Sequence, residues 1–191
     1  LRANGNLLGD TLRATVYREN ALPPHRNGQI WRPLPTIIQE NDADVILNGN
    51  WQSSAISGYE NGILIQNDAN PATLSYAISV DHPAVFDVFA YTVTGPLASD
   101  SARYVLQPGN GDSIIAYINQ QPMNHRGWQL LASCTLTPGH PLMVTLDNST
   151  TDAGQSLTAD ALMVMLNRKA SPELVITDNT PLTTAPENFS L

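Results

Sequence analysis

The side chains best suited to binding a ligand are a few aromatic and amide residues in the middle of the chain. Tyr59, Tyr117 and Trp128 could each offer a ring to the C–H face of a sugar, and Asn119 and Gln121 could hydrogen-bond to its hydroxyl groups. We therefore take these five as candidate ligand-binding residues, with polysaccharide as the favoured ligand class. The two amides are equally suited to closing a loop at a strand end, and both alternatives stay open.

An oxygen-rich group near the start of the folded region suggests a metal. Calcium prefers several carboxylate, carbonyl and amide oxygens, and Glu40, Asp42 and Asp44 could supply three carboxylates within one loop. They are the candidate ligands of a structural calcium ion. Ordinary turn and surface chemistry is the competing interpretation and the one we favour, and no other cofactor is expected.

Three residues have a structural interpretation. Trp128 directly follows Gly127, and Trp51 comes two residues after Gly49. At such strand beginnings a large ring could cover the open end of a sandwich while its indole N–H donates to a carbonyl. Asp160 lies between two alanines in an apolar stretch, which predicts that its carboxylate accepts hydrogen bonds from loop amides. Trp128 therefore carries two interpretations, as a packing residue and as a ligand platform.

Catalysis has little support. The four histidines fall in predicted loops, and the sequence contains no H-E-x-x-H, G-x-S-x-G or Walker pattern. The single cysteine, Cys134, sits in an alternating context typical of a buried strand residue, and one cysteine excludes an internal disulfide. We expect a protein that is not an enzyme; a hydrolase or lyase fragment with distant paired carboxylates is the last-ranked alternative.

Composition narrows the partners and the location. The 191 residues carry a net charge of -8, and the nine lysines and arginines are scattered, so nucleic acid is an unsuitable partner. No apolar run reaches the roughly 20 residues that a membrane helix needs. The low charged fraction of 14% and the many Asn, Thr, Ser, Gly and Pro residues favour a secreted or cell-surface, bacterial-like protein. The start at Leu1 fits removal of an upstream segment and fits a trimmed sequence equally well.

Short alternating apolar runs, cut by Gly, Pro, Asn and Asp clusters, dominate the middle of the chain and predict an all-β fold. The expected strands are 36–39, 62–65, 72–80, 84–92, 102–106, 113–119, 129–137, 141–147 and 157–166. So many short strands are best buried as two face-to-face antiparallel sheets, a jelly-roll-like β-sandwich.

The two ends of the chain lack the regular alternating apolar runs of the middle. We expect an arm or short helix over 1–35, the sandwich over 36–168, and an extended tail over 169–191. The apolar island 174–176 in the tail predicts an extra strand. That strand could fold back on its own chain or pair with another chain.

Several different short motifs follow one another in a fixed order along the sandwich region. They include Gly49-Asn50-Trp51, the glycine-tyrosine loop that contains Tyr59, and Ile118-Asn119-Gln120 leading to Trp128. The full set lies at 38–42, 49–51, 57–62, 72–76, 85–91, 118–121, 127–131, 144–148 and 158–162. In this order the motifs resemble the golvesin C-terminal-like, xanthan-lyase-type β-sandwich domain, although Ala132 replaces a usual glycine. The resemblance implies a β-sandwich with an accessory role.

These observations together favour a non-catalytic extracellular recognition or attachment module, polysaccharide-binding and part of a larger secreted or surface protein. The rival hypothesis is a structural subunit of a surface filament or layer, which self-associates through its terminal arm or strand.

Overall fold

The protein is described by a computed structural model that covers residues 29–30, 34–60, 62–170 and 175–176. The chain divides into two compact units, one spanning Pro33–Pro172 and the other made of Leu1–Arg32 with Glu173–Leu191. The larger unit contains all of the predicted sandwich. Among the described residues, no helix has the length and apolar character needed to cross a membrane.

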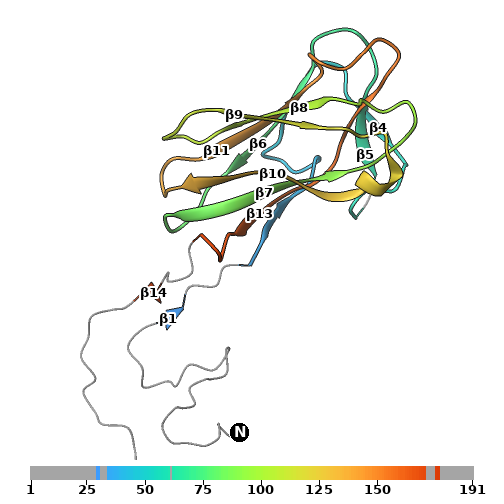
Figure 1. Cartoon of the computed structure of the whole chain (residues 1–191). Helices are drawn as coiled ribbons and strands as arrows, with labels where there is room; N and C mark the ends of the chain where they lie inside the picture. The colour runs from blue at the N-terminus through green and yellow to red at the C-terminus, as the bar shows by residue number, and fades with distance from the viewer. Residues whose placement is uncertain (1–28, 31–33, 61, 171–174, 177–191) are drawn as a thin grey trace, which may run out of the picture. The chain divides into compact units, whose positions relative to one another are not determined.

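Two stacked antiparallel sheets make up most of the larger unit (Figure 1). The five-stranded sheet contains, in spatial order, β3 (Ile46–Asn48), β6 (Thr73–Ile78), β11 (Leu142–Asp147), β8 (Ala102–Gln107) and β9 (Ile114–Ile118). The four-stranded sheet contains β10 (Gly127–Leu136), β7 (Ala84–Thr92), β13 (Leu162–Leu166) and β2 (Thr36–Ile38). A smaller sheet contains β12 (Leu157–Ala159), β5 (Ile63–Gln66) and β4 (Gln52–Ser54). The predicted all-β sandwich is confirmed.

Period-two alternation along the strands builds the core between the sheets. In β7 the side chains of Phe86 and Val88 are buried, whereas those of Asp87, Phe89 and Tyr91 lie half-exposed on the outer face. The strands of the five-stranded sheet bury fully enclosed leucines in the same way, and each such leucine contributes roughly 1.5–3 kcal/mol to folding. The half-buried residues Asp87, Phe89 and Tyr91 therefore form part of the outer face of the four-stranded sheet.

Most predicted strands differ from the observed ones by one or two residues at an end, and two differences are larger. Strands β3 and β4 were not predicted, because β3 is exposed throughout and β4 is the polar run Gln-Ser-Ser. The predicted strand 157–166 is wrong as a single element, because it is two strands, β12 and β13. The chain leaves the small sheet at Asp160 and joins the four-stranded sheet through β13, which pairs with β7.

The smaller unit contains one two-stranded pairing among its described residues. Strand β1 (Gln29–Ile30) pairs antiparallel with β14 (Val175–Ile176), with Gln29 opposite Ile176 and Ile30 opposite Val175. Strand β14 falls within the apolar island 174–176 and pairs with a strand of its own chain. Of the expected arm or short helix over 1–35, residues 1–28 and 31–33 lie outside the described residues, as do residues 171–174 and 177–191 of the expected tail.

Candidate functional site

Three aromatic rings meet on the outer face of the four-stranded sheet. Trp128 of β10 lies directly opposite Tyr91 of β7 in the strand register, and their ring centroids are 5.2 Å apart. Tyr59 joins them from the loop between β4 and β5, 5.0 Å from Trp128 and 5.6 Å from Tyr91. All three side chains are half-buried, with part of each ring open to solvent. We call Tyr59, Tyr91 and Trp128 the aromatic trio.

The loop that carries Tyr59 is fastened to the core by Asp160. The backbone N–H of Tyr59 donates to Asp160 Oδ2 at 2.8 Å, and the N–H of Ala161 donates to Asp160 Oδ1 at 2.8 Å. Gly58 makes this approach feasible, because a Cβ at that position would lie far inside van der Waals contact of the Asp160 carboxylate. The carboxylate at the β12–β13 break therefore positions one ring of the trio.

The pKa of Asp160 is raised in the folded protein. Burial raises the pKa of this carboxyl, while the hydrogen bonds from Ala161 and Tyr59 and the positive charge of Arg126 act to lower it. Arg126, at the entry to β10, also donates to the carbonyl of Ser57 in the Tyr59 loop. The loop is thus held from two sides.

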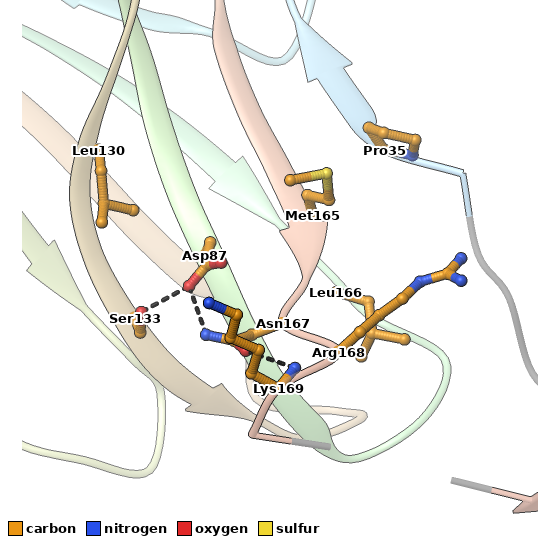
Figure 2. Close-up of a pocket in the computed structure, with 9 residues that line it drawn as sticks. All are labelled: Pro35, Asp87, Leu130, Ser133, Met165, Leu166, Asn167, Arg168 and Lys169. Atoms are coloured by element: carbon orange, nitrogen blue, oxygen red, sulfur yellow. Dashed lines mark hydrogen bonds between the residues drawn. The ribbon is translucent and has the colours of Figure 1, made fainter. Parts of the chain in front are cut away.

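A pocket of about 520 Å³ lies farther along the same outer face (Figure 2). Leu130 and Met165 supply apolar walls, and Pro35 lines the pocket from the residues that precede β2. Arg168 and Lys169, which follow β13, line it as well. The pocket combines apolar and cationic side chains on a rigid sheet.

Asp87 is the acidic residue of this pocket, and its carboxylate is already bonded. Ser133 Oγ donates to Asp87 Oδ1 at 2.5 Å, and Asn167 Nδ2 donates to the same oxygen at 2.8 Å. Asn167 Oδ1 in turn accepts from the backbone N–H groups of Lys169 and Ala170, at 3.0 and 2.9 Å. Figure 2 shows this network as dashed lines around Asp87. It fixes the turn that presents Arg168 and Lys169.

The predicted ligand-binding residues do not all come together. Tyr59 and Trp128 are brought into contact, but Tyr117 lies on the five-stranded sheet, 55% exposed and opposite Arg103 in the register. Asn119 Oδ1 accepts from the N–H of Gln121, and Gln121 Nε2 donates to the carbonyl of Ala98. Both amides therefore take part in closing the loop after β9.

The three candidate metal ligands, Glu40, Asp42 and Asp44, have different surroundings. Glu40 is buried, and its Oε2 has no hydrogen-bond partner among the described residues. Burial, and then the nearby charges of Asp160 and Asp42, raise the pKa of Glu40. Asp42 Oδ2 accepts from the N–H of Gln39 at 2.9 Å, and Asp44 is exposed. No three His, Cys, Asp or Glu side chains gather as a metal site in the part of the chain that the structure describes, and the calcium ion stays a prediction.

Trp51 lies half-buried at the start of β4. Its indole N–H donates to the carbonyls of Asn48 and Thr73, at 3.1 and 3.0 Å. Because Asn48 ends β3 and Thr73 begins β6, this one ring connects three strands.

Sequence reasoning missed Tyr91, Asp87, Ser133 and Asn167. The alternation of β7 does place Asp87 and Tyr91 on one face of their strand. The pattern alone does not say which face is the outer one, or that Trp128 lies opposite Tyr91. That information depends on the pairing of strands far apart in the sequence.

Comparison with protein families gives one match. The family model described as the Golvesin C-terminal domain matches residues 36–166, which is most of the sandwich. A search of curated proteins found no match.

Solved structures share the fold at low sequence identity. A xanthan lyase from Paenibacillus superposes with a TM-score of 0.61 at 15% identity, over 69% of this chain and 13% of the lyase. A CBM35 module from Cellvibrio japonicus gives a TM-score of 0.51 at 16% identity, covering 76% of this chain and 99% of the module. A further CBM35, solved in complex with a glucuronic acid containing disaccharide, gives 0.51 at 16% identity, covering 75% and 98%. The chain therefore corresponds to a small part of the lyase and to nearly all of each module.

Proposed function

The chain belongs to the Golvesin C-terminal domain family, and on this premise we propose that it is a non-catalytic module that binds polysaccharide on the outer face of its four-stranded sheet. The aromatic trio is the observation that carries the proposal. The centroids of three half-buried rings lie within 5.6 Å of one another over the four-stranded sheet. The hydrogen bond from the Tyr59 N–H to Asp160 holds the loop that carries Tyr59. Rings of this kind pack against the C–H faces of sugars.

The rest of the face supports an extended ligand. Apolar side chains of β10 and β13, among them Leu130, Met163 and Met165, are half-exposed or exposed beside the trio. Hydrogen-bonding groups follow at Asp87, Ser133 and Asn167 in the pocket. A polysaccharide offers both apolar faces and hydroxyl groups, and so it matches both kinds of surface.

The neighbours in fold agree with this function. The CBM35 modules that share the fold are carbohydrate-binding modules, and one was solved with a bound disaccharide. An accessory binding module of this kind is useful next to extracellular polysaccharide, and we propose a secreted or cell-surface location on that ground. Fractionation of the source cells and detection of the chain in medium, envelope and cytoplasm would test the location.

Affinity electrophoresis and titration calorimetry against a panel of soluble polysaccharides test the binding proposal. We expect Trp128→Ala and Tyr91→Ala to weaken binding by roughly ten- to thirtyfold, the loss typical of an aromatic anchor. Ile115→Ala is the matched control, because it removes another exposed large apolar side chain, from β9 of the five-stranded sheet. Circular dichroism melts of each variant separate lost binding from lost folding.

Two results would contradict the proposal. One is a folded Trp128→Ala variant that binds as well as the wild type. The other is a loss of binding in Tyr117→Ala alone, which would move the platform to the five-stranded sheet.

A further inference from the structure

Positive charge on the larger unit is scarce and is concentrated at one place. Residues 33–172 contain four basic residues against twelve acidic ones. Arg103 forms an ion pair with Asp147, and Arg126 lies near Asp160 and donates to Ser57. The other two, Arg168 and Lys169, are consecutive, exposed, and both line the pocket of Figure 2.

These two cations are available to a ligand. Within the described residues, neither side chain has an ion-pair or hydrogen-bond partner; only the Lys169 backbone N–H is bonded, to Asn167 Oδ1. The one acid in the pocket, Asp87, has Oδ1 occupied by Ser133 and Asn167. The pocket therefore carries two positive charges against one negative charge in a unit that is otherwise strongly acidic.

The pocket and the aromatic trio lie along one strand. Tyr91 and Asp87 are four residues apart on the outer face of β7, which corresponds to about 13 Å at the rise of an extended strand. Phe89 lies between them, opposite Leu130 of β10 and Met163 of β13. One extended ligand could therefore contact both regions across an apolar floor.

We propose that this face selects acidic polysaccharides, with the rings of the trio holding one sugar and the pocket receiving the carboxylate of a uronic acid farther along the chain. The inference rests on the proposed function and specifies its ligand. Arg168 presents the planar donor fork that matches a carboxylate, and Lys169 adds a mobile ammonium group. The two cations of the pocket are complementary in charge to a carboxylate, and this local complementarity argues for an anionic group there.

The test compares each polyuronate with its own neutral form. Polygalacturonate and alginate are titrated into the full chain alongside their methyl-esterified forms. Each titration is carried out once at low salt and once at about 0.5 M NaCl, which screens charge interactions. We expect at least one polyuronate to bind on the order of tenfold more tightly than its ester, and this preference to shrink in high salt.

The decisive variant is Arg168→Gln with Lys169→Gln. We expect it to weaken binding of the polyuronate on the order of tenfold, and so to abolish the preference for the acid over its ester. The matched control is Gln107→Glu with Ser113→Asp, which shifts the net charge by the same amount through two exposed residues of another region. It should keep the preference.

Five outcomes would overturn the inference. The first four are equal binding of acid and ester, an unchanged preference in the Arg168/Lys169 variant, an equal loss in the control, and no binding of either polyuronate. A second copy of the chain covering this face would show a concentration-dependent mass in light scattering and no polyuronate binding, which also overturns it. In each of these cases the proposed function would still be supported if a neutral polysaccharide binds to the wild type and binds more weakly to Trp128→Ala.

Discussion

At the scale of single residues, the contact between Gly58 and Asp160 controls the aromatic trio. Gly58→Ala would drive a methyl group into the Asp160 carboxylate and displace the Tyr59 loop. We expect polysaccharide binding to weaken on the order of tenfold, with a stability loss of about 1–3 kcal/mol. Calorimetric titration and urea denaturation measure the two effects. Gly95→Ala is the control, because a Cβ there meets nothing within 4 Å and should leave both quantities unchanged.

Glu40 makes stability depend on pH. Its pKa is raised in the folded protein, so the folded state holds a proton that the unfolded state releases, and stability must fall as pH rises from about 4 through the raised pKa. Asp160, Asp42 and the buried phenol of Tyr76 are the ionisable groups around it. We expect Glu40→Gln to be more stable than the wild type at pH 7 and to lose part of that advantage at pH 4. Chemical denaturation across this pH range measures both.

Calcium is the competing account of the same buried carboxylate. A bound cation would stabilise ionised Glu40, so Glu40→Gln would then lower stability at pH 7 and remove any rise in Tm caused by added calcium. Thermal melts with calcium and with EDTA decide between the two accounts. A rise in Tm on adding calcium that is lost in Glu40→Gln would support the predicted metal site.

The residues that sequence reasoning could identify are those whose type alone suggests a role. Tyr59 and Trp128 follow glycines and are large amphipathic rings, and the structure brings them together. Tyr91 is an equally good ring, but inside an alternating strand an aromatic residue faces the core as readily as the solvent. Asn119 and Gln121 show the reverse. Their amide groups suit a ligand, yet Asn119 Oδ1 and Gln121 Nε2 form hydrogen bonds within the protein that help to close the loop after β9.

At the scale of elements, alternation was informative wherever one face of a strand is buried. The prediction for β7, 84–92, agrees with the structure at both ends, because five of its nine side chains point into the core. Strands β3 and β4 could not be predicted from alternation, because neither strand has one buried and one exposed face. The break at Asp160 was missed because apolar residues continue on both sides of it.

Trp51 shows how one side chain can join elements that the pattern does not reveal. Trp51→Ala would remove the ring that links β3, β4 and β6 and leave the carbonyl of Thr73 without its indole donor. Because the ring is only half-buried, we expect a loss of about 1–3 kcal/mol in the free energy of unfolding, measured by urea denaturation. Trp51→Phe keeps most of the ring and should lose less. A fully stable Trp51→Ala variant would show that the three strands hold together without it.

At the scale of the whole molecule, the pairing of β1 with β14 bears on self-association. The apolar island that could have bound a neighbour's sheet edge pairs with Gln29–Ile30 of its own chain. We therefore expect light scattering to give the mass of a monomer over a wide range of concentration. A mass that rises with concentration, and returns to that of a monomer when residues 170–191 are deleted, would instead support assembly through the terminal strand.

The aromatic trio has an optical consequence. Trp128 lies within 5.2 Å of two tyrosines whose rings are inclined to its own by 60° and 85°. Chromophores this close and this inclined couple their electronic transitions and exchange excitation energy, so the near-ultraviolet circular dichroism and the tyrosine-to-tryptophan transfer both depend on the position of Tyr59. The protein thus carries its own spectroscopic reporter, and a sugar that shifts the Tyr59 loop becomes visible without any label.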